Sequence, residues 1–278
     1  MSLSNYKNHI GFGIAGNFAL HLEQAGELED FKDIETNDEN GPKGMFPFYL
    51  PRMEGQLGEF PLCSETILLP KEAVNVQAEP EVGLICKLSY KEGKVYNIEP
   101  THFAAYNDCS IRKAGAKKIS EKKNWGASSK GLSQQLIPID KFEPGGVMDQ
   151  WRIASFLRRN DEVMPYGEDV ELTGYSYFYE KLCRWMTHQI NTQQDKGPLE
   201  PLLDYIESCQ YPAHAVISIG ATRYTPFGET HFLNEGDEVI IVLYDGEMHC
   251  ANTIMADAIA KNYDKKGVSY LVKSVKQG

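Results

Sequence analysis

The sequence predicts a mixed α+β fold, because strand-type and helix-type periodicities occur in separate blocks of the chain. Residues 74–84 alternate apolar and polar side chains with a period of two, the pattern of a strand with one polar face. Residues 102–112 and 238–244 are two further strand candidates. The strands do not alternate regularly with helices, so a doubly wound parallel sheet is not indicated.

Two helices are predicted between the early and the late strands. Apolar residues recur at helical spacing over residues 178–190 and, after Pro198, over residues 199–206. A strand over 215–220 follows. The Asp245-Gly246 pair favours a hairpin returning through residues 248–251, and a helix over 256–263 and a strand over 268–275 complete the prediction.

Length and composition favour one soluble domain. The 278 residues are 42% hydrophobic and 24% charged, and no apolar run reaches the roughly 18 to 20 residues that span a bilayer. The N-terminal residues are polar, so the expected location is cytoplasmic. Six scattered cysteines without a paired Cys-x-x-Cys motif argue against a thiolate zinc site.

The net charge of −11 disfavours nucleic acid and anionic membranes as partners. Residues 112–130 are the basic exception. A solvated loop is the plainer interpretation of this stretch, and a funnel for a small anionic substrate is the alternative.

The segment Glu79-Pro80-Glu81 carries the first candidate site. Residues i and i+2 of a strand share one face, so the two carboxylates are predicted to lie side by side, where a hard divalent cation would neutralise them. An exposed polar strand face explains such a pair equally well. Pro80 removes a ladder donor, however, which implies an edge or bulge where sites often form.

Asp108 follows in Asn107-Asp108-Cys109-Ser110-Ile111-Arg112, where an Asn-Asp turn is the simpler explanation. Together with Glu79 and Glu81, this segment resembles the fumarylacetoacetate hydrolase family. Its members carry a Glu-x-Glu strand followed by Asn-Asp-(Val/Met)-(Ser/Thr)-Ala-Arg-Asp. The resemblance implies that Glu79, Glu81 and Asp108 hold a divalent cation, Mg²⁺ or Mn²⁺, with Ca²⁺ as an alternative.

Other segments extend the resemblance over roughly residues 10–250. Residues 11–21 are similar to the family's Gly-x-Asn-Tyr-x-x-His segment, which implies a catalytic His21. Residues 129–133 are similar to its Lys-(Gly/Ser)-Phe-Asp stretch, which implies that Lys130 reaches the substrate. Residues 225–228 and 233–239 resemble its Thr-Pro-x-Gly and Lys-Pro-Gly-Asp-x-Val elements.

The resemblance also implies an architecture: a mixed β-roll or β-sandwich with a few flanking helices, in one domain over residues 1–278. Residues 1–70 form an N-terminal segment with a lid-type helix, residues 71–250 the metal-binding β core, and residues 251–278 a C-terminal extension of open role. A homodimer is expected, since family members commonly form dimers. Arg112 and either Thr222 or Thr225 are expected to contact the substrate.

The family's histidine is followed three residues later by a glutamate that orients it as a general base, but Gln24 stands there in this chain. On a helix, Glu23 would point about 200° away from His21, so it is no substitute. A neutral amide orients an imidazole without stabilising its protonated form, which weakens the case for water activation. Two further departures are the missing lysine in residues 48–51 and Lys113 in place of an aspartate.

In this family the cation polarises the carbonyl of a small 2-oxo acid or β-dicarbonyl compound. The expected activity is C–C bond hydrolysis, decarboxylation or tautomerisation, and Gln24 favours the latter two. The alternative is a non-catalytic metal-binding or ligand-binding protein that retains the pocket. Taken alone, His21 would be a half-buried helix residue, Lys130 a surface lysine and Arg112 an ion-pair residue.

Overall fold

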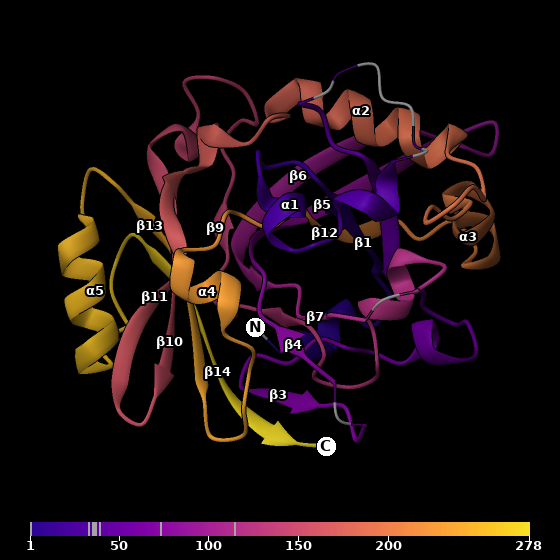
Figure 1. Ribbon diagram of the computed structural model, residues 1–278. Coiled ribbons are helices and arrows are strands. Elements are labelled where there is room, and N and C mark those ends of the chain that lie inside the picture. Colours follow the sequence, from indigo (N-terminus) through magenta and orange to yellow (C-terminus); the bar gives the residue numbers. More distant parts are fainter. Residues whose placement is uncertain (1, 33, 35–37, 39, 73, 114) are drawn as a thin grey trace.

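A computed structural model describes residues 2–32, 34, 38, 40–72, 74–113 and 115–278. Two β-sheets form the body, with helices on their outer sides (Figure 1). The first sheet has the strand order β2-β1-β12-β5-β6-β8, with β9 also pairing with β6; the second has the order β11-β10-β13-β14-β3, and β4 pairs with β7 apart from both. The expected α+β class with a few flanking helices is confirmed.

The strands have the following bounds. In the first sheet they are β1 (Ile10–Ala15), β2 (Gly44–Tyr49), β5 (Pro80–Lys91), β6 (Lys94–Asn107), β8 (Gly131–Leu132), β9 (Ile137–Pro138) and β12 (His214–Ser218). In the second they are β3 (Thr66–Leu69), β10 (Trp151–Arg159), β11 (Glu162–Glu171), β13 (Glu238–Asp245) and β14 (Val268–Gln277). The separate pair is β4 (Val76–Gln77) and β7 (Ser110–Ile111).

Helices and short 3-10 turns connect and cover these strands. The α-helices are α1 (His21–Gln24), α2 (Tyr179–Thr192), α3 (Leu202–Ser208), α4 (Pro226–Thr230) and α5 (Ala251–Ala260). The 3-10 turns are η1 (Leu3–Tyr6), η2 (Leu28–Phe31), η3 (Gln56–Gly58), η4 (Ile119–Lys122), η5 (Val147–Gln150) and η6 (Leu172–Gly174). Helix α2 packs on β6 and β2, whereas α5 lies against β11 (Figure 1). None of the helices in the described ranges is long and apolar enough to cross a bilayer.

The main hydrophobic core lies where the sheets face each other, because β6 packs against both β13 and β14. Val82, Phe103 and Leu243 are fully buried there, and the Phe103 ring meets Trp151 edge to face at 4.8 Å between centroids. The alternation in residues 74–84 therefore places one side of β5 in this core. The acidic residues Glu79 and Glu81 lie at the N-terminal end of β5, with their side chains on the opposite face.

Three predicted elements are discontinuous or of another type in the structure. Residues 102–112 do not form one strand: β6 ends at Asn107, and the chain pairs again only in β7. Residues 74–84 do not form one strand: the chain leaves β4 before Pro80, which has no N–H for the ladder, and only then begins β5. Residues 248–251 do not return as a hairpin strand, so that prediction is wrong. The chain enters α5 instead, because the Cys250 N–H donates to Thr253 Oγ1 at 3.0 Å in a capping box.

The C-terminal residues, whose role the sequence leaves open, belong to the second sheet. Strand β14 lies between β13 and β3, antiparallel to the first and parallel to the second. Segments far apart in the sequence also meet in the first sheet, where β1 pairs in parallel with β12 and β12 pairs with β5.

Candidate metal centre

The register of β5 and β6 brings the acidic residues together. Pro80 pairs with Asn107, so Glu79 and Asp108 lie opposite each other one step beyond that pair. The Asp108 N–H donates to the Glu79 carbonyl oxygen at 3.0 Å, and the Asn107 side chain accepts the Glu79 N–H at 3.2 Å. Glu81 is two residues further along β5 and therefore shares a face with Glu79.

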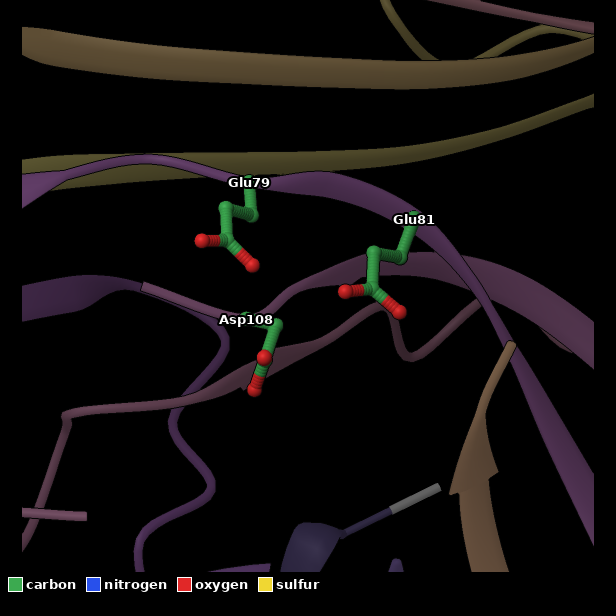
Figure 2. Close-up of side chains that lie close together, drawn as sticks. All are labelled: Glu79, Glu81 and Asp108. Carbon is green, nitrogen blue, oxygen red and sulfur yellow. The ribbon is translucent and has the colours of Figure 1, made fainter. Parts of the chain in front are cut away.

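Glu79, Glu81 and Asp108 form the acidic triad. One oxygen from each carboxylate lies within 4.8 Å of the other two, and the three side chains turn toward a common space (Figure 2). The residues are 3%, 1% and 0% exposed. Three carboxylates packed this closely and away from water repel each other strongly unless cations neutralise them.

Three cationic side chains provide part of that neutralisation. Lys123 Nζ lies 2.6 Å from Glu79 Oε2 and 2.8 Å from Asp108 Oδ2. Lys130 Nζ lies 3.1 Å from Asp108 Oδ1, and Arg112 Nη2 lies 2.9 Å from Glu79 Oε1. Glu81 has no such partner within the described chain: its carboxylate accepts the Gly220 backbone N–H at 2.8 Å.

The pKa shifts follow this division of partners. Burial by itself would raise the pKa of Glu79, but Lys123 and Arg112 outweigh burial and lower it, so Glu79 stays ionised. Burial, Asp108 and Glu79 together raise the pKa of Glu81 well above its ordinary value. The raised pKa of Glu81 thus agrees with the absence of a cationic side chain in contact with it among the described residues.

The donor set fits a hard divalent cation. Glu79 Oε1 and both carboxylate oxygens of Asp108 are buried, and their contacts among the described residues are ion pairs at 2.8 to 3.1 Å rather than hydrogen bonds. Carboxylate oxygens converging from three side chains are the ligands that Mg²⁺, Mn²⁺ and Ca²⁺ take in proteins. The acidic triad is thus a candidate divalent-cation site.

His21 lies beside the triad at the start of α1. Its ring packs 5.2 Å from that of Tyr224, and it is close enough to Glu79 and Arg112 for their charges to affect it. Burial lowers the pKa of His21 to about 4. The imidazole is therefore neutral near pH 7, and its Nδ1 has no hydrogen-bond partner in the described part of the chain.

Gln24, expected to orient His21, bonds elsewhere. Its Nε2 donates to the Tyr224 carbonyl oxygen at 3.1 Å, and its Oε1 accepts the Tyr224 N–H at 2.9 Å. This amide thus holds the backbone next to the site. Glu23 is exposed, as its position on the helix predicts. The acidic residue near the site is Glu27, the N-cap of η2, which is buried and accepts hydrogen bonds from Arg112 at 2.8 Å and from Lys122 at 2.9 Å.

Arg112, expected to contact substrate, is already bonded at each nitrogen of its guanidinium. Nε donates to Gln77 at 2.7 Å, Nη1 to Glu27 at 2.8 Å, and Nη2 to the Tyr224 hydroxyl at 3.0 Å. Burial would lower the pKa of Arg112, but Tyr224, Glu79 and Glu27 together outweigh burial and raise it. In this arrangement Arg112 joins the α1 segment to the triad.

The two candidate threonines occupy different places. Thr222 is fully buried, and its N–H donates to the carbonyl oxygen of Pro80, between the two triad glutamates, at 3.1 Å. Thr225 is the N-cap of α4, where its hydroxyl accepts the Gly228 N–H and donates to the Pro165 carbonyl oxygen. Thr222 is therefore the threonine beside the triad.

The basic stretch is only partly solvated. Lys113 and Lys117 are exposed, but Lys122, Lys123 and Lys130 are buried, so the interpretation as a solvated loop is wrong for these three. Sequence reasoning missed Lys123 and Glu27 as site residues. The local signal was a pair of adjacent lysines beside an Asn-Trp segment, and nothing in that pattern marks which lysine turns inward.

Comparisons with known proteins extend these observations. No curated protein matches the sequence. A yeast fumarylacetoacetate hydrolase family protein of known structure is 16% identical, with a TM-score of 0.55, over 99% of this chain and 96% of its own. A 2-keto-3-deoxy-D-arabinonate dehydratase complexed with magnesium and 2,5-dioxopentanoate is 13% identical, with a TM-score of 0.54, over 100% and 82%.

A third solved structure is the 5-carboxymethyl-2-hydroxymuconate delta-isomerase from Mycobacterium smegmatis. It is 14% identical, with a TM-score of 0.51, over 97% of this chain and 79% of its own. The structural similarity to these three proteins shows a shared fold, and at such low identities it shows the fold alone. The expected fumarylacetoacetate hydrolase-like architecture is therefore confirmed. The profile of a family of unknown function, DUF5718, matches residues 27–275, and the chain therefore belongs to the DUF5718 family and has the fumarylacetoacetate hydrolase fold.

Proposed function

We propose that this protein is a divalent-cation-dependent enzyme that acts on a small anionic 2-oxo acid or β-dicarbonyl compound. The observation that carries the proposal is the convergence of three buried carboxylates with oxygens left unpaired by hydrogen bonds. The fold match to a dehydratase complexed with magnesium and a dioxo acid supports the same choice. Mg²⁺ or Mn²⁺ is the proposed ion, with Ca²⁺ as the alternative.

Glu79, Glu81 and Asp108 would hold the cation. When bound, the cation would polarise a substrate carbonyl and stabilise the negative charge that develops on it. Lys130 lies beside Asp108 with its ammonium facing the site, so it would contact the carboxylate or carbonyl oxygen of an anionic substrate. Thr222 would fix the backbone between the two glutamates.

The surroundings of His21 favour decarboxylation or tautomerisation over hydrolysis. A base must take a proton from water to activate it, and an imidazole whose pKa is lowered to about 4 by burial is a weak base at neutral pH. Neither Glu23 nor Gln24 gives the ring a charged partner, because the first is exposed and the second bonds to Tyr224. Decarboxylation needs only a polarised carbonyl, and tautomerisation moves a proton on a substrate that the cation has already made more acidic, so neither reaction requires a base strong enough to activate water.

The test combines metal binding with activity. Calorimetry with Mg²⁺ and Mn²⁺ should detect binding, and saturation at a hundred times the Kd should stabilise the native state by about 2.7 kcal/mol. Glu81→Gln should lose that gain, while Glu23→Gln, which changes an exposed glutamate, should keep it. Absence of binding by the unmodified protein at millimolar Mg²⁺ and Mn²⁺ would refute the cation site.

Three assays then separate the reactions: oxaloacetate decarboxylation, acylpyruvate hydrolysis and enol–keto conversion, each with and without metal. We expect the rate of decarboxylation or of enol–keto conversion to exceed the rate of hydrolysis. In Glu81→Gln, the rate of that dominant reaction should fall at least about tenfold. Hydrolysis as the dominant activity would contradict the argument from His21.

A second candidate is a metal-binding or ligand-binding protein without turnover. The closure of the site favours it, since all three triad residues are buried and a substrate must open a path to them. Metal binding with no turnover in any of the three assays would support this candidate. The homodimer and the cytoplasmic location stay predictions from the sequence.

A further inference from the structure

Lys123 has an unusual place among the cations around the acidic triad, because it contacts two of the three proposed ligands at once. Its Nζ donates to Glu79 Oε2 at 2.6 Å and lies 2.8 Å from Asp108 Oδ2. Its side chain is 4% exposed. Within the described chain, every acceptor that its ammonium contacts belongs to the triad.

The backbone fixes this position. Lys123 directly follows η4, where its N–H donates to the Ser120 carbonyl oxygen at 3.1 Å. The next residue, Asn124, is fully buried and donates to the carbonyl oxygens of Phe48 at 2.7 Å and Glu59 at 3.2 Å. The fold therefore directs the Lys123 side chain at the triad, in addition to the attraction between the charges.

Lys130 differs from Lys123 in its contacts. Lys130 touches only Asp108 within the triad, and it donates to the Cys109 carbonyl oxygen at 2.6 Å. It can keep that backbone bond whatever occupies the triad. Among the described residues, Lys123 has no such backbone acceptor: besides the two carboxylates, its ammonium only faces the Phe46 ring, 5.3 Å from the ring centroid.

A divalent ion and the Lys123 ammonium require the same carboxylate oxygens. A hard divalent ion binds oxygen at about 2.0 to 2.6 Å, whereas an ammonium lies about 2.7 to 2.9 Å from its acceptor. Two cations bridging the same pair of carboxylates would also lie within a few ångströms of each other and repel. One must leave for the other to bind at full strength.

We propose that Lys123 is a tethered ammonium that fills the cation position between Glu79 and Asp108 until a divalent ion displaces it, and that it thereby sets the metal affinity of the site. The inference rests on the proposed cation site at the triad. It makes Lys123 the residue that determines how much free metal the protein needs. The displaced ammonium stays attached beside the site, where an anionic ligand is a ready partner.

The experiment measures Mn²⁺ and Mg²⁺ binding by calorimetry in the full-length protein, Lys123→Met and Lys122→Met. Lys122 is the matched control: it is the adjacent buried lysine, but its Nζ contacts Glu27 and Asp30 and not the triad. We expect Lys123→Met to bind Mn²⁺ at least about tenfold more tightly than the unmodified protein, because a competing charge is removed. Lys122→Met should bind as the unmodified protein does.

Melting temperature is the second measurement. Metal-free Lys123→Met should melt below the unmodified protein, because Glu79 and Asp108 lose a counter-charge, and saturating Mn²⁺ should raise its melting temperature by the larger amount. If Lys123→Met does not fold without metal, Lys123→Gln takes its place, since it removes the charge and keeps a hydrogen-bond donor.

Equal or weaker metal binding by Lys123→Met would overturn the proposal about Lys123 and leave the cation site standing. Binding by neither protein would overturn the cation site and this inference together. The two failures are therefore distinguishable in one titration.

Discussion

Replacing Arg112 by methionine should destabilise the metal-free protein by about 3 kcal/mol. Removal of one partner from a buried ion pair costs roughly 3 to 5 kcal/mol, because a charge is left without compensation. Arg112 compensates Glu27 at 2.8 Å and Glu79 at 2.9 Å. After the substitution, Glu27 still has Lys122 as a partner and Glu79 still has Lys123. The lower end of that range therefore applies. Methionine preserves most of the apolar stem.

Urea denaturation at fixed pH with a chelator present measures this loss, provided that the slope with denaturant is unchanged. A double variant with Glu27→Gln removes one of the two carboxylates left behind. We therefore expect it to lose about 1 to 2 kcal/mol less than the sum of the two single variants. A loss below about 1 kcal/mol for Arg112→Met, or additive losses, would refute the structural role of Arg112. The predicted substrate contact would then be the better explanation.

Two further predictions concern a buried carboxyl group and the amide of Gln24. Burial raises the pKa of Glu200 from 4.5 to about 7, and Ser120 donates to it at 2.8 Å. As the pH rises, the unfolded chain therefore loses this proton before the folded protein does. The contribution of Glu200 to the free energy of unfolding is complete below about pH 4.5, and it falls by at most about 3 kcal/mol between there and pH 7. Denaturation at several pH values should show this fall in the unmodified protein and not in Glu200→Gln; parallel curves would contradict it. Gln24→Glu should lose about 1 to 3 kcal/mol, since it removes the donor to the Tyr224 carbonyl and places a carboxylate there, whereas Glu23→Gln should be nearly neutral. An increase in hydrolysis without a loss of stability would show instead that residue 24 acts on His21.

The shared face of Glu79 and Glu81 and the helix α2 could be predicted from local patterns, whereas Asp108 is assigned to the same site only through the resemblance to the fumarylacetoacetate hydrolase motif. The alternation around Glu79 and Glu81 places both carboxylates on one face, and the pairing of β5 with β6 brings Asp108 opposite them. Helix α2 also begins and ends within two residues of its predicted bounds. For the two glutamates and for α2, residues close in sequence carry the information, but the position of Asp108 depends on the pairing of β5 with β6.

The charges around the triad could not be predicted, because tertiary packing decides them. Lys122 and Lys123 are adjacent, yet one turns to Glu27 and the other to Glu79. That choice depends on η4 and on the anchoring of Asn124 to backbone far away in sequence. Likewise, Gln24 bonds to Tyr224, which lies 200 positions further along the chain.

The meeting of early and late segments in both sheets has a consequence for synthesis. While the chain emerges from the ribosome, β1 and β5 remain without the strand that joins them until β12 is made, and β3 waits for β14. Strand pairing in neither sheet can be completed before β12 and β14 have been synthesised, so unpaired strand edges persist during most of translation. Folding should therefore be slow and dominated by pairing between distant segments, and a nascent chain halted before β12 should depend on chaperones to stay in solution.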